Sequence, residues 1–480
     1  MSKLRAVAPR SKRIPLVALA IVCAAALLSS CGSSPASSSS AISPLGVTWM
    51  PGYAAPGTPA KYNKVGVIKV GPSNAKNILV LEPGTSAAAS YFVPLAQWLV
   101  SKTSNWQVWA VERRESLLED QSELNLFKEH KATPSQLYNY YLGYLKNPSI
   151  THHIQPVPDS TVAFAKQWGM RVAVQDLQVV IGAAKKVGGK VVLGGHSLGG
   201  SVVTAYATWD FNGRPGADDL AGLVYIDGGS SPSPVAAQAA TQELQSLNAP
   251  GATPWLSFGG IPAPFAGIYN ATGSAAALLD PNAPSLGQSS GLLPTDIVPP
   301  VPVTNAGQYG FALNAATSPS SLLAAQAHLG QGVAAAGAVH GWNGSGALTP
   351  LNRFATMFSG YPIQNADGTE WYFPQRLTDD TGAVDNGNAN PAQSMLDVAA
   401  TMGHDLPKNL LIYAFGARLG GAGVPEDAQL LAAQSGIPAS NLTLANYQST
   451  YSHNDPAGAY PNNAFFDRLV PFLGKVSAQK

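Results

Sequence analysis

Short apolar runs alternate along the chain with longer stretches in which apolar residues recur every three or four positions. The runs have the length of buried strands, and the periodic stretches have the spacing of helices that cover a sheet. We predict strands at residues 65–70, 77–81, 106–111, 190–194, 222–226, 409–415 and 442–447. We predict helices at 91–100, 162–187, 201–208 and 463–473. This alternation favours parallel pairing, so the predicted fold class is α/β, with a doubly wound, mostly parallel sheet.

Two long stretches interrupt the alternation. Residues 115–159 are charged and helical in their middle, and residues 231–390 are rich in Pro, Gly and Ala. The second stretch is too long for a plain loop in a compact sheet, so we interpret it as a cap over the edge of the sheet that carries chemistry. Within and after it we predict helices at 321–337 and 391–402 and an irregular proline-rich part at 281–303. The core then has two parts, 46–230 and 391–480.

The first thirty residues differ from the rest of the chain. A basic part is followed by an apolar run, 14–28, which is shorter than the roughly 20 residues that span a bilayer as a helix. The order of basic, apolar and small residues is typical of a signal peptide, here 1–30. The sequence Leu28-Ser29-Ser30-Cys31 resembles the lipobox of bacterial lipoproteins, which implies a lipid on Cys31 and a flexible tether at 31–45. An uncleaved anchor and an ordinary secretory signal are the alternatives.

Charge and cysteine content narrow the function classes. Without the first thirty residues the chain has 23 basic and 27 acidic residues, which leaves no basic face, so we expect no nucleic-acid partner. The lipoprotein interpretation removes Cys23 with the signal peptide and modifies Cys31, so the mature chain has no free thiol. That excludes a disulfide, thiol catalysis and a cysteine-ligated metal. We expect no metal and no other cofactor.

The motif with the clearest chemistry is Gly195-His196-Ser197-Leu198-Gly199, which fits G-x-S-x-G. Its context makes it specific, because a predicted apolar strand comes directly before it and a predicted helix directly after it. A serine at so tight a turn has a strained backbone and needs glycine neighbours. The hydroxyl then lies at a helix N-terminus, where developing negative charge is stabilised. We predict Ser197 as a nucleophile; the alternative is that the glycines only ease helix–strand packing.

With this motif the sequence resembles the α/β-hydrolase superfamily, and in particular its lipases and esterases, over residues 64–230 and 405–475. The resemblance implies an eight-stranded, mostly parallel sheet and a Ser–acid–His triad in that chain order. It also implies His453 as the base, because His453 follows the last predicted strand and precedes the closing helix. The alternative for His453 is an ordinary loop histidine.

The resemblance leaves the acid open between three residues. The family most often places it after the penultimate strand, but residues 416–421 contain no carboxylate, and the next ones are Glu426 and Asp427. A variant found in pancreatic-type lipases places the acid one strand earlier, where Asp227 follows the predicted strand 222–226. We favour Asp227, with Glu426 as the main alternative and Asp427 as a third.

An oxyanion hole needs two backbone N–H groups directed at the substrate oxygen. The resemblance implies that Leu198 supplies one and Thr85 the other, with Gly84 allowing the backbone to approach the ligand. A plain turn at Gly84 and Thr85 is the alternative.

These residues together predict an exported serine hydrolase, anchored on the extracytoplasmic face of a bacterial membrane through Cys31, that cleaves carboxylic esters through an acyl-serine intermediate. The Ala-, Leu- and Pro-rich insertion and the tether favour a small apolar, lipid-like ester as substrate. Acyl transfer on the same fold is one alternative. A catalytically silent lipoprotein that binds a ligand is the other.

Overall fold

A computed structural model describes residues 45–229, 233–258 and 260–479. Cys31, the predicted signal peptide and nearly all of the predicted tether lie outside the described residues, so the lipoprotein remains a prediction. Among the described residues, no helix combines the length and the apolar character needed to cross a bilayer.

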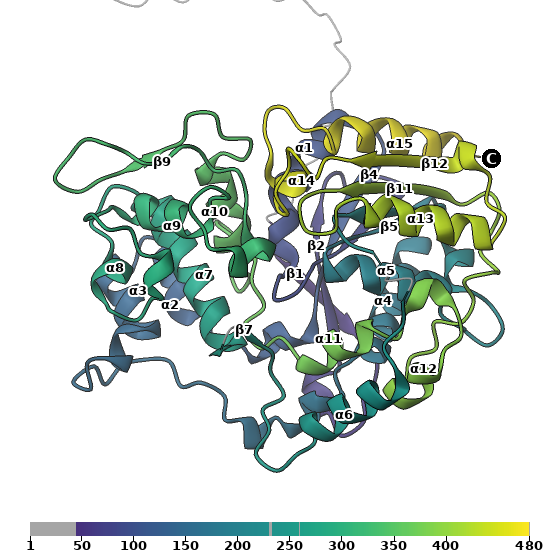
Figure 1. Cartoon of the computed structure of the whole chain (residues 1–480), viewed down its shortest axis with the longest axis horizontal. Coiled ribbons are helices and arrows are strands. Elements are labelled where there is room, and N and C mark those ends of the chain that lie inside the picture. The colour runs from purple at the N-terminus through teal and green to yellow at the C-terminus, as the bar shows by residue number, and fades with distance from the viewer. Residues whose placement is uncertain (1–44, 230–232, 259, 480) are drawn as a thin grey trace, which may run out of the picture. The chain divides into compact units, whose positions relative to one another are not determined.

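Eight strands form one central sheet in the order β1-β2-β4-β3-β5-β6-β11-β12 (Figure 1). The pairs β1–β2 and β2–β4 are antiparallel, and all other neighbours are parallel. The strands are β1 (Val47–Pro51), β2 (Lys64–Val70), β3 (Asn77–Glu82), β4 (Trp106–Glu112), β5 (Val191–His196), β6 (Gly222–Ile226), β11 (Leu411–Gly416) and β12 (Leu442–Asn446). This is the α/β-hydrolase fold, so the predicted fold class is confirmed.

The central strands are apolar along their whole length because both faces of the sheet are covered. In β3, Ile78 and Val80 join one buried cluster, whereas Leu79 and Leu81 join the other. Successive side chains of a strand point to opposite faces, so a continuous apolar run is what a sheet between two helical layers requires.

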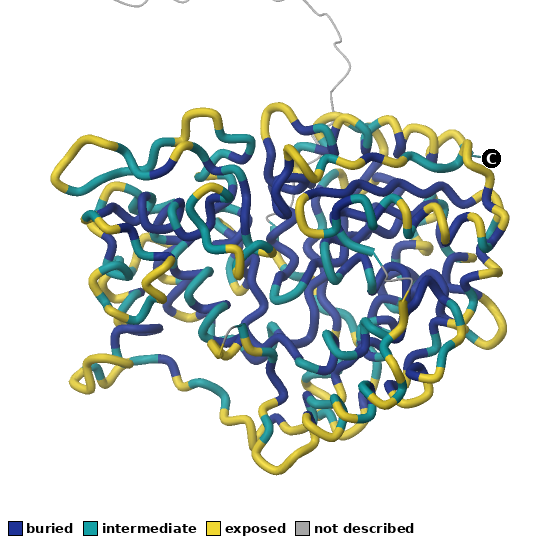
Figure 2. Tube along the Cα trace, viewed as in Figure 1, coloured by how far each residue is buried: buried dark blue, intermediate teal, exposed yellow. Residues whose placement is uncertain are grey.

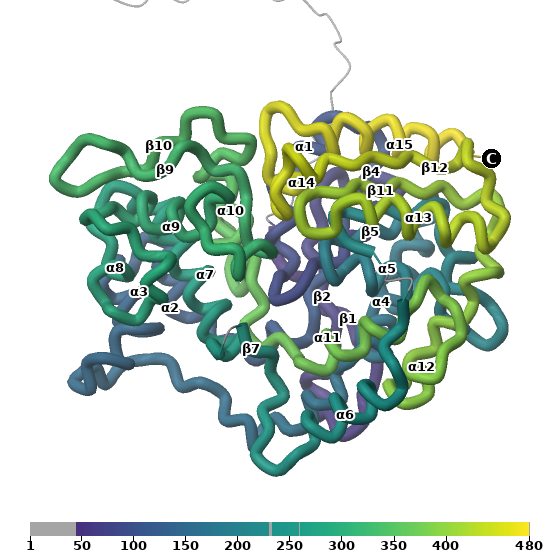
Figure 3. The backbone as a smooth tube through the Cα atoms, viewed as in Figure 1, coloured from purple at the N-terminus to yellow at the C-terminus, as the bar shows by residue number. Residues whose placement is uncertain are grey.

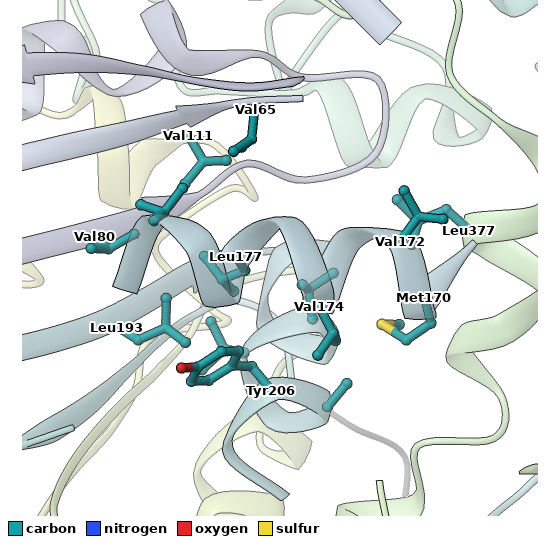
Figure 4. Close-up of a cluster of buried hydrophobic side chains, with 14 of the residues drawn as sticks. Val65, Val80, Val111, Met170, Val172, Val174, Leu177, Leu193, Tyr206 and Leu377 are labelled. Carbon is teal, nitrogen blue, oxygen red and sulfur yellow. The ribbon is translucent and has the colours of Figure 1, made fainter. Parts of the chain in front are cut away.

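Five helices cover the two faces of this sheet. One face packs against α4 (Met170–Lys185), α5 (Leu198–Thr208) and α13 (Gly423–Gln434), and the other packs against α1 (Val93–Lys102) and α15 (Phe466–Ala478). Figure 4 shows Leu177 of α4 in one cluster with Val80 of β3 and Leu193 of β5. Helices were predicted in the regions of α1, α4, α5 and α15, whereas α13 was not predicted.

The two stretches that interrupt the sheet pack against each other. The first supplies α2 (Ser122–Lys128) and α3 (Pro134–Tyr141), and both contact α7 (Ala263–Leu279) of the second. Around α7 lie the remaining helices of this group: α8 (Leu286–Ser289), α9 (Asn305–Leu313) and α10 (Leu351–Ser359). We name these six helices, with the segments between α7 and α11 (Gln375–Thr381), the cap (Figure 3). Buried residues continue from the sheet into the cap (Figure 2).

Not all of the range 231–390 lies in the cap. The helix α6 (Ala237–Leu247) packs against α11 and α12 (Pro391–Leu396), and α11 packs against α4 and α5. The boundaries predicted for the cap, 231–390, stay a prediction. Two short strand pairs complete the elements: β7 (Ser257–Phe258) with β8 (Ile261–Pro262), and β9 (Gly332–Val333) with β10 (Trp342–Asn343).

Three predicted helices are wrong in extent. The helix predicted at 162–187 begins only at Met170, because the backbone at Gly169 is extended, with ψ of −159°. Residues 321–337 contain only the 3₁₀ helix η9 (Ser320–Ala325) and the strand β9, because Gly330 and Gly332 have φ of 140° and 122°, which no helix accepts. The helix predicted at 391–402 ends at Leu396, since Asp397 has the left-handed φ of 56°.

Candidate active site

Ser197 lies in the turn between β5 and α5, with φ 57° and ψ −129°. A positive φ costs a serine about 1–3 kcal/mol, so the surrounding contacts must enforce it. Its N–H donates to the Ile226 carbonyl at 3.0 Å, which ties the turn to the end of β6. A Cβ added to Gly195 would overlap the Gly199 carbonyl, and one added to Gly199 would overlap the Glu82 carbonyl. The glycines of the motif therefore allow the close approach that holds Ser197 in this conformation.

His453 and Asp227 form a fully buried pair. His453 lies in the loop between β12 and α14 (Asp455–Gly458), and its Nδ1 is 2.6 Å from Asp227 Oδ2. Both residues are 1% exposed. An ionised carboxylate only accepts hydrogen bonds, so Nδ1 must carry the proton and Nε2 has a free lone pair. This is the tautomer that a histidine base requires.

Asp227 is held as an ionised acceptor by the loop after β11. Its Oδ1 accepts N–H groups from Ala417 at 2.6 Å and Gly420 at 2.9 Å, and its Oδ2 accepts that of Leu419 at 3.1 Å. Burial alone would raise the pKa of Asp227, but the hydrogen bond and charge of His453, with the Ala417 N–H, bring that pKa below its ordinary value. The loop after β11, which lacks a carboxylate up to residue 421, thus supplies N–H donors to the carboxylate of Asp227, directly after β6.

The two alternative acids lie elsewhere. Glu426 is exposed in the first turn of α13, and Asp427 follows it. Among the described residues, neither carboxylate contacts His453. Of the three candidates, the structure brings Asp227 together with the imidazole.

His196 packs against His453. The two rings lie 4.3 Å apart between centroids, and His196 Nε2 donates to the His453 carbonyl at 2.9 Å. Burial, with the nearby His453, lowers the pKa of His196 to about 3, so this ring is neutral. The Tyr91 hydroxyl contacts His196 Nε2 at 3.4 Å and donates to Asn454 Oδ1 at 2.9 Å. No sequence pattern pointed to Tyr91, which comes from the 3₁₀ turn before α1.

Gly84 lies beside Ser197, in the loop after β3, and Thr85 follows it. A Cβ on Gly84 would be 2.8 Å from Ser197 Cβ and 3.4 Å from Ser197 Oγ. Within the described ranges, the backbone N–H groups of Thr85 and Leu198 donate to no protein acceptor. Their place agrees with the predicted oxyanion hole, and their role stays a prediction.

We name residues 83–88 the oxyanion loop, after the role predicted for Gly84 and Thr85. The cap holds this loop mainly by backbone contacts. The Ala88 N–H donates to the Gly368 carbonyl at 3.1 Å, and the Glu370 N–H donates to the Ser86 carbonyl at 3.0 Å. In return the Ser86 hydroxyl donates to the Glu370 carbonyl at 2.7 Å. The second half of the loop, at Ser86 and Ala88, is therefore joined to the cap segment 368–370.

A second cap segment, 324–328, holds the loop of the histidine. The Asn454 N–H donates to the Gln326 carbonyl at 3.1 Å, and its side-chain amide donates to the Ala324 carbonyl at 3.1 Å. His328 Nδ1 lies 2.5 Å from Oδ2 of Asp455, whose carboxylate is fully buried. The two residues after His453 are thus anchored to the cap.

Comparisons with known proteins extend to distant structures only. No family model matches the chain, and no curated protein matches its sequence. A putative lipase from Sulfolobus solfataricus is 12% identical with a TM-score of 0.44, covering 89% of this chain and 93% of that one. An esterase from Thermogutta terrifontis is 13% identical with a TM-score of 0.36, covering 90% and 99%. A carboxyl esterase from Bacillus coagulans is 9% identical with a TM-score of 0.38, covering 90% and 99%. All three TM-scores are below 0.5, so we infer nothing about the activity of this chain from these structures.

Proposed function

We propose that this protein is an exported, membrane-anchored serine hydrolase that cleaves carboxylic esters with Ser197, His453 and Asp227. The observation that carries the proposal is the buried pair of His453 and Asp227, with 2.6 Å between Nδ1 and Oδ2. A buried ionised carboxylate on an imidazole is costly to hold, and its chief chemical use is to orient a base and stabilise its cation. The strained turn at Ser197 supports the same assignment.

The proposed reaction begins with transfer of the Ser197 hydroxyl proton to His453 Nε2 while Oγ attacks the ester carbonyl carbon. The negative charge that develops on the carbonyl oxygen is stabilised by the N–H groups of Leu198 and Thr85. Asp227 stabilises the imidazolium, which then protonates the departing alcohol and leaves an acyl-serine. Water, activated by the same histidine, releases the acid.

An apolar acyl group is favoured by the side chains around the site. Leu198 and Leu322 are partly exposed, and Leu419, whose N–H donates to Asp227, is 44% exposed. Leu198 directly follows Ser197, the backbone of Leu419 bonds to Asp227, and Leu322 lies in the short helix whose Ala324 carbonyl accepts from Asn454. An apolar ligand that covered these leucines would gain about 25 cal/mol per Å² of apolar surface buried.

The test of the serine mechanism is labelling of the full chain in detergent with a fluorophosphonate probe. We expect wild type to be labelled, Ser197→Ala not to be labelled, and His453→Ala to react at least about 10³-fold more slowly. His404→Ala, at an exposed histidine, is the matched control and should label normally. Folded wild-type protein that does not label would favour a silent, ligand-binding hydrolase fold instead.

Nitrophenyl esters from acetyl to lauroyl, assayed with and without an added alcohol, then separate hydrolysis from acyl transfer. Free acid as the main product supports hydrolysis, whereas ester of the added alcohol supports a transferase. Turnover that rises with chain length supports an apolar acyl pocket.

The anchor is tested by cell fractionation and palmitate incorporation. We expect wild type to incorporate palmitate and to partition with membranes, and Cys31→Ala to incorporate none. Cys23→Ala is the matched control, because the proposed signal peptidase removes Cys23. Incorporation that persists in Cys31→Ala would contradict the proposed lipidation site.

A further inference from the structure

Arg113 is a buried arginine directly after β4 whose guanidinium is saturated with partners. Its side chain is 6% exposed. Nη1 donates to Glu82 Oε1 at 2.8 Å, and Nη2 donates to Glu370 Oε2 at 2.7 Å. The same two nitrogens also donate to three backbone carbonyls: Pro83 at 3.0 Å, Gly84 at 2.8 Å and Ala87 at 3.0 Å. The Arg113 side chain thus donates hydrogen bonds to three backbone carbonyls of the oxyanion loop.

The planarity of the peptide bond transmits this contact to the other side of the loop. In a trans peptide the C=O of one residue and the N–H of the next lie in one plane and point in opposite directions. Arg113 holds the carbonyls of Pro83 and Gly84, so the N–H groups of Gly84 and Thr85 must point away from the guanidinium. Gly84 is the residue that approaches Ser197 Cβ, and Thr85 is the proposed oxyanion donor.

A single cation that binds two consecutive carbonyls therefore aligns two consecutive N–H groups. Such runs of aligned backbone N–H groups form anion-binding concavities. Arg113 is suited to this because its planar fork presents five donors in fixed directions, which a lysine does not. Burial alone would lower the pKa of Arg113, but Glu370 and Glu82 raise that pKa above its usual value. The guanidinium group therefore stays charged.

We infer that Arg113 is a positioning residue for oxyanion stabilisation, acting through the Pro83 and Gly84 carbonyls to hold the backbone at Gly84 and to direct the N–H group of Thr85 at the substrate oxygen. The inference rests on the proposed ester hydrolysis. It adds a residue that does not touch the substrate yet sets the geometry of the transition state.

Arg113→Lys is the main test, and Arg114→Lys is its matched control. Arg114 is equally buried and binds Asp176, Asn63 and Tyr53, none of which belongs to the oxyanion loop. In the full chain we expect Arg113→Lys to lower kcat by about 10²-fold or more with KM changed less than about threefold. Arg114→Lys should lose a similar amount of thermal stability and keep its kcat.

A transition-state analogue gives a readout that a merely structural role would not move. Ser197 Oγ adds to the carbonyl carbon of a trifluoromethyl ketone while its proton passes to His453, and the resulting hemiketal oxygen carries the negative charge. Its affinity should fall in Arg113→Lys in parallel with kcat/KM, whereas the affinity for the product acid should not. Equal losses of kcat in both lysine variants, or no loss in Arg113→Lys, would overturn the inference.

Glu370→Gln covers the case in which Arg113→Lys does not fold. This variant keeps Arg113 and the backbone of residue 370, but it removes the carboxylate charge to which Arg113 Nε and Nη2 donate. The guanidinium group is then held less firmly in its position. We expect kcat to fall by about threefold to tenfold at constant KM, and an unchanged kcat would count against the inference. Wild type without Ser197-dependent turnover would instead refute the proposed function, and the role of Arg113 with it.

Discussion

Replacing Asp227 by Asn keeps the size of the side chain but exchanges one carboxylate oxygen for an NH₂ group. Oδ1 of Asp227 accepts two N–H groups, from Ala417 and Gly420, so the amide oxygen of Asn will take that position. The NH₂ group then faces the N–H of Leu419 and Nδ1 of His453. To avoid two opposed donors, His453 must accept at Nδ1 and carry its proton on Nε2.

A histidine with its proton on Nε2 cannot take one from Ser197. The resulting loss is that of a wrong tautomer, about 10⁴-fold in kcat, which corresponds to about 5 kcal/mol in the activation barrier. The Leu419 N–H also loses its acceptor, and a buried unsatisfied donor costs about 1–3 kcal/mol of folding stability. The variant should therefore fold with a lower Tm and be nearly inactive.

The assay is kcat and KM on a short nitrophenyl ester, with circular dichroism to establish that the variant is folded. Glu426→Gln is the control, because its carboxylate is exposed on α13 and should leave kcat unchanged. A folded Asp227→Asn variant that retains more than about a tenth of wild-type kcat would refute the assignment of Asp227. A large loss in Glu426→Gln would transfer the role to that residue.

Two further predictions concern stability. Burial raises the pKa of Glu112 to about 8 from its ordinary 4.5, so the folded chain binds a proton there that the unfolded chain has lost, and stability falls as pH rises from about 4.5 to about 8. Glu112→Gln mimics the neutral acid, so its Tm relative to wild type should increase between pH 5 and pH 8; a constant difference would contradict this. A Cβ on Gly228 would overlap the Ser197 carbonyl, whereas one on Gly229 would meet nothing within 4 Å. Gly228→Ala should therefore cost about 1–3 kcal/mol in denaturant unfolding and reduce labelling of Ser197, while Gly229→Ala should do neither, and equal effects would refute the packing argument.

The parts of the fold that sequence could predict are those fixed by local patterns. The strands buried on both faces stand out as apolar runs, and the turn at Ser197 is recognisable because strand, glycines and helix are contiguous. Strand β1, by contrast, was not predicted, because it has only five residues, ends in Pro51 and lies at the edge of the sheet. Helix α7 was missed because it is rich in Ala and Gly and contacts α2, α3, α9 and α10, which leaves no single polar face.

The supports of the site were beyond sequence reasoning because their partners are far apart in the chain. Arg113 meets Glu370 across 257 positions, and Asp455 meets His328 across 127. No periodicity links such residues. The acid stayed open for a similar reason, because the donors that stabilise Asp227 come from a loop 190 or more residues later.

The cap contacts described above have a consequence for how this protein can change over evolution or by design. Segment 368–370 joins the oxyanion loop, and segment 324–328 joins the loop of His453. The cap is therefore no interchangeable module that only selects substrates. A chimaera that exchanges it for the cap of another protein of this fold has to transplant both segments. Otherwise it will keep the sheet and Ser197 but lose the support of the two loops on which the proposed reactivity of Ser197 depends.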